Sequence, residues 1–92
     1  MTKKLGNYKG NDVELCTTTS GRIGNKTAIA LMENRVPFTK IKKYIPFYKR
    51  NKNNGYKFVW VITTSPRQYG DARRVIDEMD MFYKERLVIS NY

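Results

Sequence analysis

Tyr56-Lys57-Phe58-Val59-Trp60-Val61-Ile62-Thr63 is the stretch of the chain that decides its fold class. Most of these side chains are aromatic or β-branched, the two kinds that are enriched in β-strands. The dipeptide Asn54-Gly55, directly before the stretch, is a strong hairpin-turn signal. We therefore predict a strand from Tyr56 to Thr63 that follows a hairpin connection.

Other strands are predicted on either side of this one. Residues 12–18 alternate between apolar and polar side chains, which is typical of a half-buried strand. Residues 38–48 alternate as well, but Pro46 cannot donate a ladder hydrogen bond. This second strand is therefore expected at an edge of the sheet, or to end near the proline. The apolar residues 87–89 predict a short closing strand.

Helices are predicted in the two intervals between strands. The turn over residues 20–25 offers N-cap side chains, and the helix that it opens should stop before Val36-Pro37, because the residue before a proline disfavours the α region. A second helix is predicted where apolar residues recur at helical spacing: Ala72, Val75, Ile76, Met79 and Phe82 or Tyr83. The resulting order predicts an α+β domain of the ferredoxin-like βαββαβ type, a two-layer sandwich with an antiparallel sheet and helices on one face.

A short internal sequence repeat supports this order of elements and suggests an anion-binding site. The segment Thr18–Arg22 resembles Thr63–Arg67, although chance similarity between turn residues is an equal alternative. Right-handed crossovers predict that the first and third strands are central neighbours with the same direction, which would bring both turns to one end of the sheet. Helix N-termini there would favour an anion, or the hydroxyls would simply cap the helices. The anion-binding residues expected at this end are Ser20, Arg22, Lys26, Ser65 and Arg67.

Composition narrows the function classes. The length of 92 residues fits one domain, with residues 1–11 as a flexible arm and residues 12–92 as the folded part. The absence of histidine and the single Cys16 argue against common metal sites and against nucleophile–histidine catalysis. We expect no metal, no cofactor, no catalytic residues and no enzyme activity. The single cysteine and the lack of a long apolar run predict a cytoplasmic protein without a membrane span.

Charge points to a polyanionic partner. The formal net charge is +10, and no acidic residue lies between Glu33 and Asp71. Such an excess attracts nucleic acid or acidic protein, unless it is merely a soluble basic surface. Aromatic side chains in a basic field are what single-stranded nucleic acid uses for stacking. The predicted nucleic-acid-binding residues are Lys40, Lys42, Lys43, Tyr44, Lys49, Arg50, Lys52, Tyr56 and Trp60.

Two orientations of the central strand remain open. If its valines face the helices, then Tyr56, Phe58 and Trp60 face outward onto the open side of the sheet; otherwise these aromatic residues form the core face. The partner expected is RNA or single-stranded DNA. The alternatives are an acidic protein docked by a regulator or inhibitor, a small anionic ligand, and a second copy of the chain paired through the open sheet face.

Two resemblances bear on these expectations. The segment Asn54–Val61 is similar to the RNP1 segment of RNA-recognition motifs in Gly55, Tyr56, Phe58 and Val59, which implies RNA binding on the sheet. The helical segments 28–38 and 71–79 resemble the small prokaryotic ferredoxin-like domains described as putative signal-transducing proteins. That resemblance implies the same fold and a regulatory or adaptor role.

Overall fold

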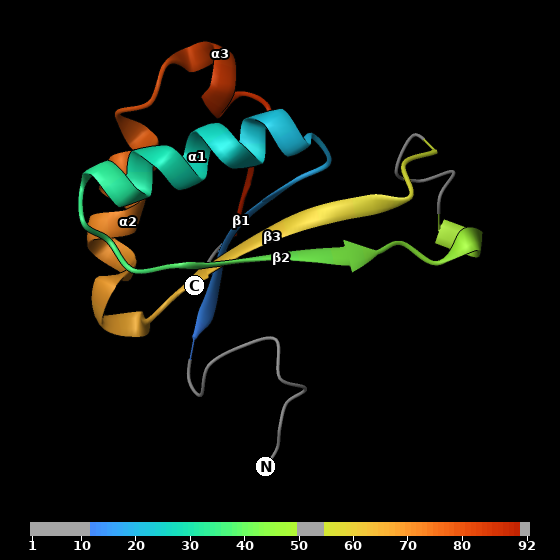
Figure 1. The fold of residues 1–92 in the computed structure, drawn as a ribbon, viewed down its shortest axis with the longest axis horizontal. Helices are drawn as coiled ribbons and strands as arrows, with labels where there is room; N and C mark the ends of the chain where they lie inside the picture. Colours follow the sequence, from blue (N-terminus) through green and yellow to red (C-terminus); the bar gives the residue numbers. More distant parts are fainter. Residues whose placement is uncertain (1–11, 50–54, 91–92) are drawn as a thin grey trace.

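The computed structural model describes residues 12–49 and 55–90 (Figure 1). The predicted arm over residues 1–11 lies outside this part of the chain. The elements are β1 Val13–Thr18, α1 Gly21–Glu33, β2 Thr39–Tyr44, the short 3-10 helix η1 Phe47–Lys49, β3 Phe58–Thr64, the 3-10 helix η2 Pro66–Gln68, α2 Tyr69–Asp77, α3 Met81–Lys84 and β4 Val88–Ile89.

The strands form one four-stranded sheet with the order β2-β3-β1-β4. Each neighbouring pair is antiparallel: β2 with β3, β3 with β1, and β1 with β4. The predicted α+β class with an antiparallel sheet is therefore confirmed. The expectation that β1 and β3 are parallel was wrong. Each crossover through a helix skips one position in the sheet, so β1 is parallel to β2 and β3 to β4, with an antiparallel strand between the members of each pair.

The helices pack against one face of the sheet, and the core lies between the two layers (Figure 1). Helix α1 begins at a predicted cap, because the Ser20 hydroxyl accepts a hydrogen bond from the Ile23 amide. Buried side chains from β1, α1, β3 and α2 meet in this core, among them Leu15, Ile23, Leu31, Ile62, Val75 and Ile76. None of the described helices is long and apolar enough to cross a membrane.

A β-bulge in β1 shifts its alternation. The register moves between Glu14 and Cys16, so that Leu15 and Cys16, although adjacent in sequence, both belong to the helix-side core. Across the sheet, Cys16 pairs with Ile62, and Thr18 pairs with Trp60. Trp60 and Ile62 therefore face the helices. Of the two orientations that the sequence left open, the structure has the one with aromatic residues on the helix side.

The second strand and the second helix are much shorter than predicted. The second strand ends at Tyr44, before Pro46, and the chain then turns through η1. The second helix is broken, because the Asp80 side chain accepts a hydrogen bond from the Phe82 amide and caps a separate helix, α3. This break turns α3 toward α1, where the Lys26 ammonium lies 5.6 Å from the centroid of the Tyr83 ring.

The end of α1 carries a testable conformational strain. Arg35 has a positive φ of 59°, a left-handed conformation that non-glycine residues rarely adopt. The Val36 amide donates to Leu31 and the Arg35 amide donates to Met32, the Schellman pattern in which glycine is usual. We expect Arg35→Gly to stabilise the protein by about 1 kcal/mol in urea unfolding, since glycine removes the Cβ clash. Glu33→Gly, at the last residue of α1, is the control and should destabilise the protein. An Arg35→Gly variant that is no more stable than the wild type would contradict this explanation.

The thiol of Cys16 gives a second test, because it is fully buried in the core. Burial, with a smaller contribution from Glu14, raises its pKa from 9.0 to about 12. The folded chain then holds this proton more tightly than the unfolded chain, so the stabilisation is complete below pH 9 and is lost as the pH rises toward 12.

We expect urea unfolding of the wild type to lose up to about 1.4 kcal/mol from this group for each pH unit above 9. Cys16→Ala removes this contribution, so its stability should fall less over the same pH range. An equal pH dependence in the two proteins would show that the thiol does not contribute.

Candidate nucleic-acid interface

Strands β2 and β3 carry a cluster of basic and aromatic side chains on their helix-side face. The register pairs Lys40 with Ile62, Lys42 with Trp60, and Tyr44 with Phe58, so alternate residues of β2 share the face of Trp60. In the view of Figure 1 this part of the sheet extends past the start of α1, so helices do not cover all of it. We call the set Lys40, Lys42, Tyr44, Phe58 and Trp60 the hairpin cluster.

Cation–π contacts hold the two lysines over the rings. The Lys42 ammonium lies 4.3 Å from the centroid of Phe58 and 5.5 Å from that of Trp60. The Lys40 ammonium lies 5.0 Å from the Trp60 centroid and donates a hydrogen bond to the Asn25 side chain. These contacts orient two positive charges side by side, at a small free-energy gain for exposed groups.

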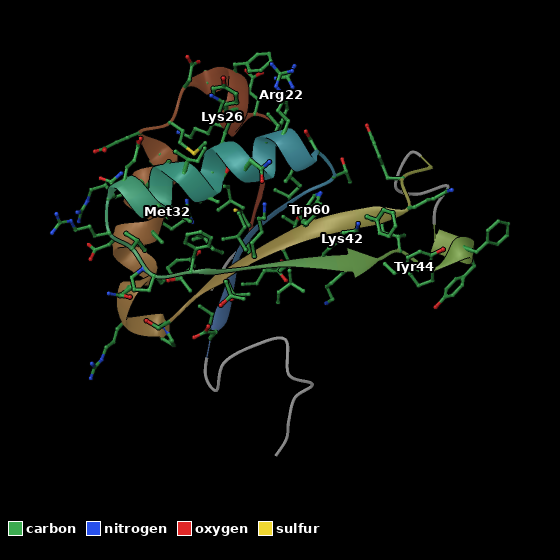
Figure 2. All side chains as sticks on the ribbon, in the orientation of Figure 1. Arg22, Lys26, Met32, Lys42, Tyr44 and Trp60 are labelled. Carbon is green, nitrogen blue, oxygen red and sulfur yellow. The ribbon has the colours of Figure 1, made fainter. Side chains whose placement is uncertain are left out.

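The aromatic residues of the cluster play different parts. Trp60 packs beneath the first turns of α1, where its ring lies 3.4 Å from the position that a Cβ on Gly21 would occupy. The Trp60 ring therefore contacts α1 as well as Lys40 and Lys42. Tyr44 (labelled in Figure 2) and Phe58 meet edge to face, with their ring centroids 5.4 Å apart, and are 64% and 37% exposed. Because Lys42 covers one face of Phe58, Tyr44 offers the larger free ring area for stacking.

A pocket of about 400 Å³ lies next to the cluster, between the start of α1, α3 and the segment before β3. Two arginines, Arg22 from α1 and Arg86 from the turn after α3, line it together with the rings of Tyr56 and Phe82 and with the Thr18–Ser20 segment. None of the lining residues is acidic. We call this hollow the arginine pocket. The pocket adjoins the hairpin cluster, because Thr18 pairs with Trp60 and Tyr56 lies two residues before the start of β3 at Phe58.

The structure brings together part of the predicted nucleic-acid-binding set. Lys40, Lys42, Tyr44 and Trp60 lie in the hairpin cluster, and Tyr56 lies in the adjoining pocket. Lys43 pairs with Val59 and lines a depression of about 320 Å³ on the opposite face of the sheet, together with Glu14. The Lys49 side chain lies outside the described residues, as do Arg50 and Lys52.

The expectation that the two turns of the predicted anion site lie at the same end of the sheet was wrong. Thr18 pairs with Trp60 at one end of the β1–β3 ladder, whereas Val13 pairs with Thr64 at the other. Ser20, Arg22 and Lys26 follow β1, while Ser65 and Arg67 follow β3, so antiparallel pairing holds the two groups at opposite ends of the sheet. The two turns lie apart because β1 and β3 are neighbours in the sheet but run in opposite directions.

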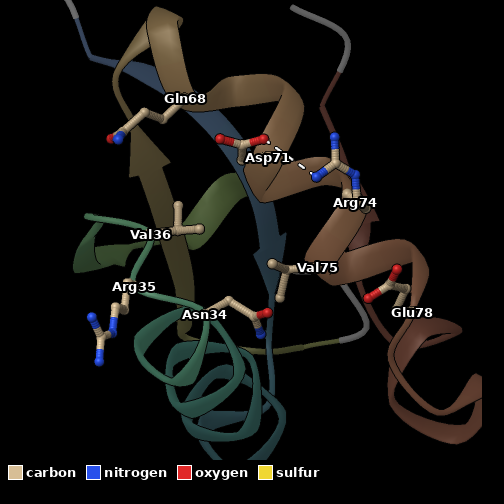
Figure 3. Close-up of a pocket in the computed structure, with 8 residues that line it drawn as sticks. All are labelled: Asn34, Arg35, Val36, Gln68, Asp71, Arg74, Val75 and Glu78. Carbon is tan, nitrogen blue, oxygen red and sulfur yellow. Dashed lines mark ion pairs between the residues drawn. The ribbon is translucent and has the colours of Figure 1, made fainter.

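Another hollow lies between the end of α1 and α2 (Figure 3). Its volume is about 280 Å³, and its charged side chains are of both signs: Arg35 and Arg74 against Asp71 and Glu78. Arg74 and Asp71 form an exposed ion pair of 3.5 Å. Because the acidic groups offset the basic ones, this hollow suits a polyanion less well than the arginine pocket does.

Sequence reasoning missed Phe82, Arg86 and Asn25. The first two reach the site only because the chain breaks at Asp80 and α3 turns toward α1. The available signal was Asp80 itself, an N-cap residue followed by an apolar pair. Among the described residues, no group of histidine, cysteine and carboxylate side chains could hold a metal ion.

No protein-family model matches the sequence, and searches of curated proteins and of solved structures give no significant match. The fold and the site define the chain as a strongly basic α+β protein whose antiparallel sheet carries a cation–aromatic cluster beside an arginine-lined pocket.

Proposed function

We propose that this protein is a non-enzymatic module that binds single-stranded nucleic acid, RNA or DNA. The binding surface is the hairpin cluster with the adjoining arginine pocket. The observation that carries the proposal is the alignment of Lys40 and Lys42 over an aromatic row, with no carboxylate in the cluster or the pocket.

Each part of this surface matches a feature of a single strand. Ammonium and guanidinium groups contact phosphates, which gives most of the affinity without sequence preference. The exposed rings of Tyr44 and Tyr56 stack against bases, which are accessible in a single strand but not in a duplex. The register of β2 and β3 repeats these groups along the strand direction, so that successive nucleotides meet successive side chains.

We further propose that the domain is of the ferredoxin-like type. Support comes from the order β2-β3-β1-β4 and from two crossovers that each skip one strand, the arrangement of a split βαβ pair. The break between α2 and α3 is then a local elaboration of the second crossover.

Binding to a panel of single-stranded and double-stranded DNA and RNA, at two salt concentrations, tests the proposed function. We expect single strands to bind more tightly than duplexes of the same length. The logarithm of the affinity should fall by about 0.7 for each phosphate contact per tenfold rise in salt. An affinity that does not depend on salt concentration, or no binding to any member of the panel, would contradict the proposal.

An acidic protein surface is the second candidate partner. The observation that favours it is that the Lys42 ammonium lies over the rings of Phe58 and Trp60. An acidic protein would bind the lysine charges and leave these contacts intact, whereas a base stacked on the same rings would displace Lys42. Pull-down from a lysate with and without nuclease treatment separates the two. A complex that survives nuclease favours the protein partner, and one that disappears favours nucleic acid.

A further inference from the structure

The arginine pocket has features that the rest of the basic surface lacks. Arg86 is held in place at two points: its Nη1 donates to the Phe82 carbonyl at 2.6 Å, and its guanidinium carbon lies 4.0 Å from the centroid of the Phe82 ring. A guanidinium has five N–H donors, so Arg86 keeps donors for a ligand. Arg22 lines the same hollow from α1.

Within residues 12–49 and 55–90, no carboxylate forms an ion pair with an arginine of this pocket. Among the described residues, the ion pairs join Arg74 to Asp71 and Lys84 to Asp77, and neither pair includes Arg22 or Arg86. Two guanidinium groups facing one hollow repel each other unless an anion lies between them. A dianion satisfies this pair better than the single charge of an internal phosphodiester does.

The remaining walls fit a nucleoside. Tyr56 and Phe82 contribute aromatic surface, and the hollow of about 400 Å³ falls within the size range of small-ligand sites. The pocket also adjoins the hairpin cluster, because Thr18, which lines it, pairs with Trp60. A terminal phosphate monoester is a dianion, whereas an internal phosphodiester carries one charge, so a terminal nucleotide fits the two arginines better than an internal one.

We propose that the arginine pocket binds the phosphate monoester of a nucleotide, presented either by the phosphorylated end of a single strand or by a free mononucleotide. Arg22 and Arg86 bind the phosphate oxygens, and Tyr56 and Phe82 contact the base. This inference rests on the proposed nucleic-acid function for its first source of ligand but not for its second.

The test compares oligonucleotides of one sequence that carry a phosphate at the 5′ end, at the 3′ end or at neither end. We expect a terminal phosphate at one end to raise the affinity of the wild type about tenfold. This preference should be lost in Arg22→Gln and in Arg86→Gln. The Arg22 side chain forms no ion pair among the described residues, so its replacement breaks none there. The preference should persist in Arg67→Gln, which removes the same charge at the opposite end of the sheet.

A titration with adenosine monophosphate, followed by amide chemical shifts, forms the second arm. If oligonucleotides bind with no preference for a terminal phosphate, and adenosine monophosphate does not shift the amides of the pocket, the inference fails while the proposed function stands. If no oligonucleotide binds but adenosine monophosphate shifts these amides, and Arg22→Gln abolishes the shift, the pocket is a mononucleotide site and the proposed function fails. A terminal-phosphate preference that survives both arginine variants also overturns the inference.

Discussion

The double variant Lys40→Gln/Lys42→Gln is expected to bind a single-stranded oligonucleotide about twentyfold more weakly than the wild type near 0.1 M salt. The magnitude follows from counterion release, since each lost phosphate contact removes about 0.7 from the log–log salt slope. The slope of the double variant should therefore be shallower by about 1.4. Both quantities are measurable by fluorescence anisotropy over a series of salt concentrations.

A matched control removes the same charge elsewhere. Lys43→Gln combined with Arg67→Gln changes one lysine on the opposite sheet face and one arginine at the far end of the sheet. This control should weaken binding only slightly, through the lower net charge. Thermal unfolding of both variants checks that the fold persists, since the lost cation–π contacts are worth about 0.5–1 kcal/mol each at exposed sites. Equal affinities for the wild type and the Lys40/Lys42 variant would contradict the assignment of the surface.

The largest effect on stability is expected from Leu31→Ala. Leu31 has 0% exposure and lies in the core cluster with Ile62 and Ile76, between α1 and the sheet. Truncation removes buried apolar surface and leaves a cavity, which costs about 2–5 kcal/mol. Since small domains are stable by only about 5–15 kcal/mol, this is a large share of the total. Urea unfolding followed by circular dichroism should show a much lower midpoint.

Met32 provides the control for that experiment. It follows Leu31 directly in α1 but points away from the core and is 63% exposed (Figure 2). Met32→Ala should change the stability by no more than about 0.5 kcal/mol, since alanine also favours the helix. Similar losses in both variants would mean that the orientation of α1 differs from the one described.

Local sequence patterns predicted much of the secondary structure. The run of β-branched and aromatic residues before Thr64 predicted β3, and the Ser20 cap and Val36-Pro37 bracketed α1. The direction of β1 relative to β3 was not predictable in this way, because it depends on how two crossovers interleave. The bulge at Glu14 and Cys16 has no turn residue to mark it, so the sequence pattern left both faces of the sheet open.

The candidate site was also predictable only in part. Period-two spacing was enough to group Lys40, Lys42 and Tyr44, because residues of one strand share a face regardless of the rest of the fold. Their neighbours Arg22 and Arg86 come from distant segments, and only the turn at Asp80 brings them to one pocket. The grouping of Ser65 and Arg67 with Arg22 failed because it required two strands to run in the same direction.

The most direct test of the proposed interface is a map of backbone amide shifts during titration with a short single-stranded oligonucleotide at low salt. We predict that the largest shifts occur in residues 40–44, in residues 56–60 and at Arg22 and Arg86. Shifts confined to α2, or to the sheet face that carries Lys43, would contradict the proposed interface, as would a titration that perturbs no amide.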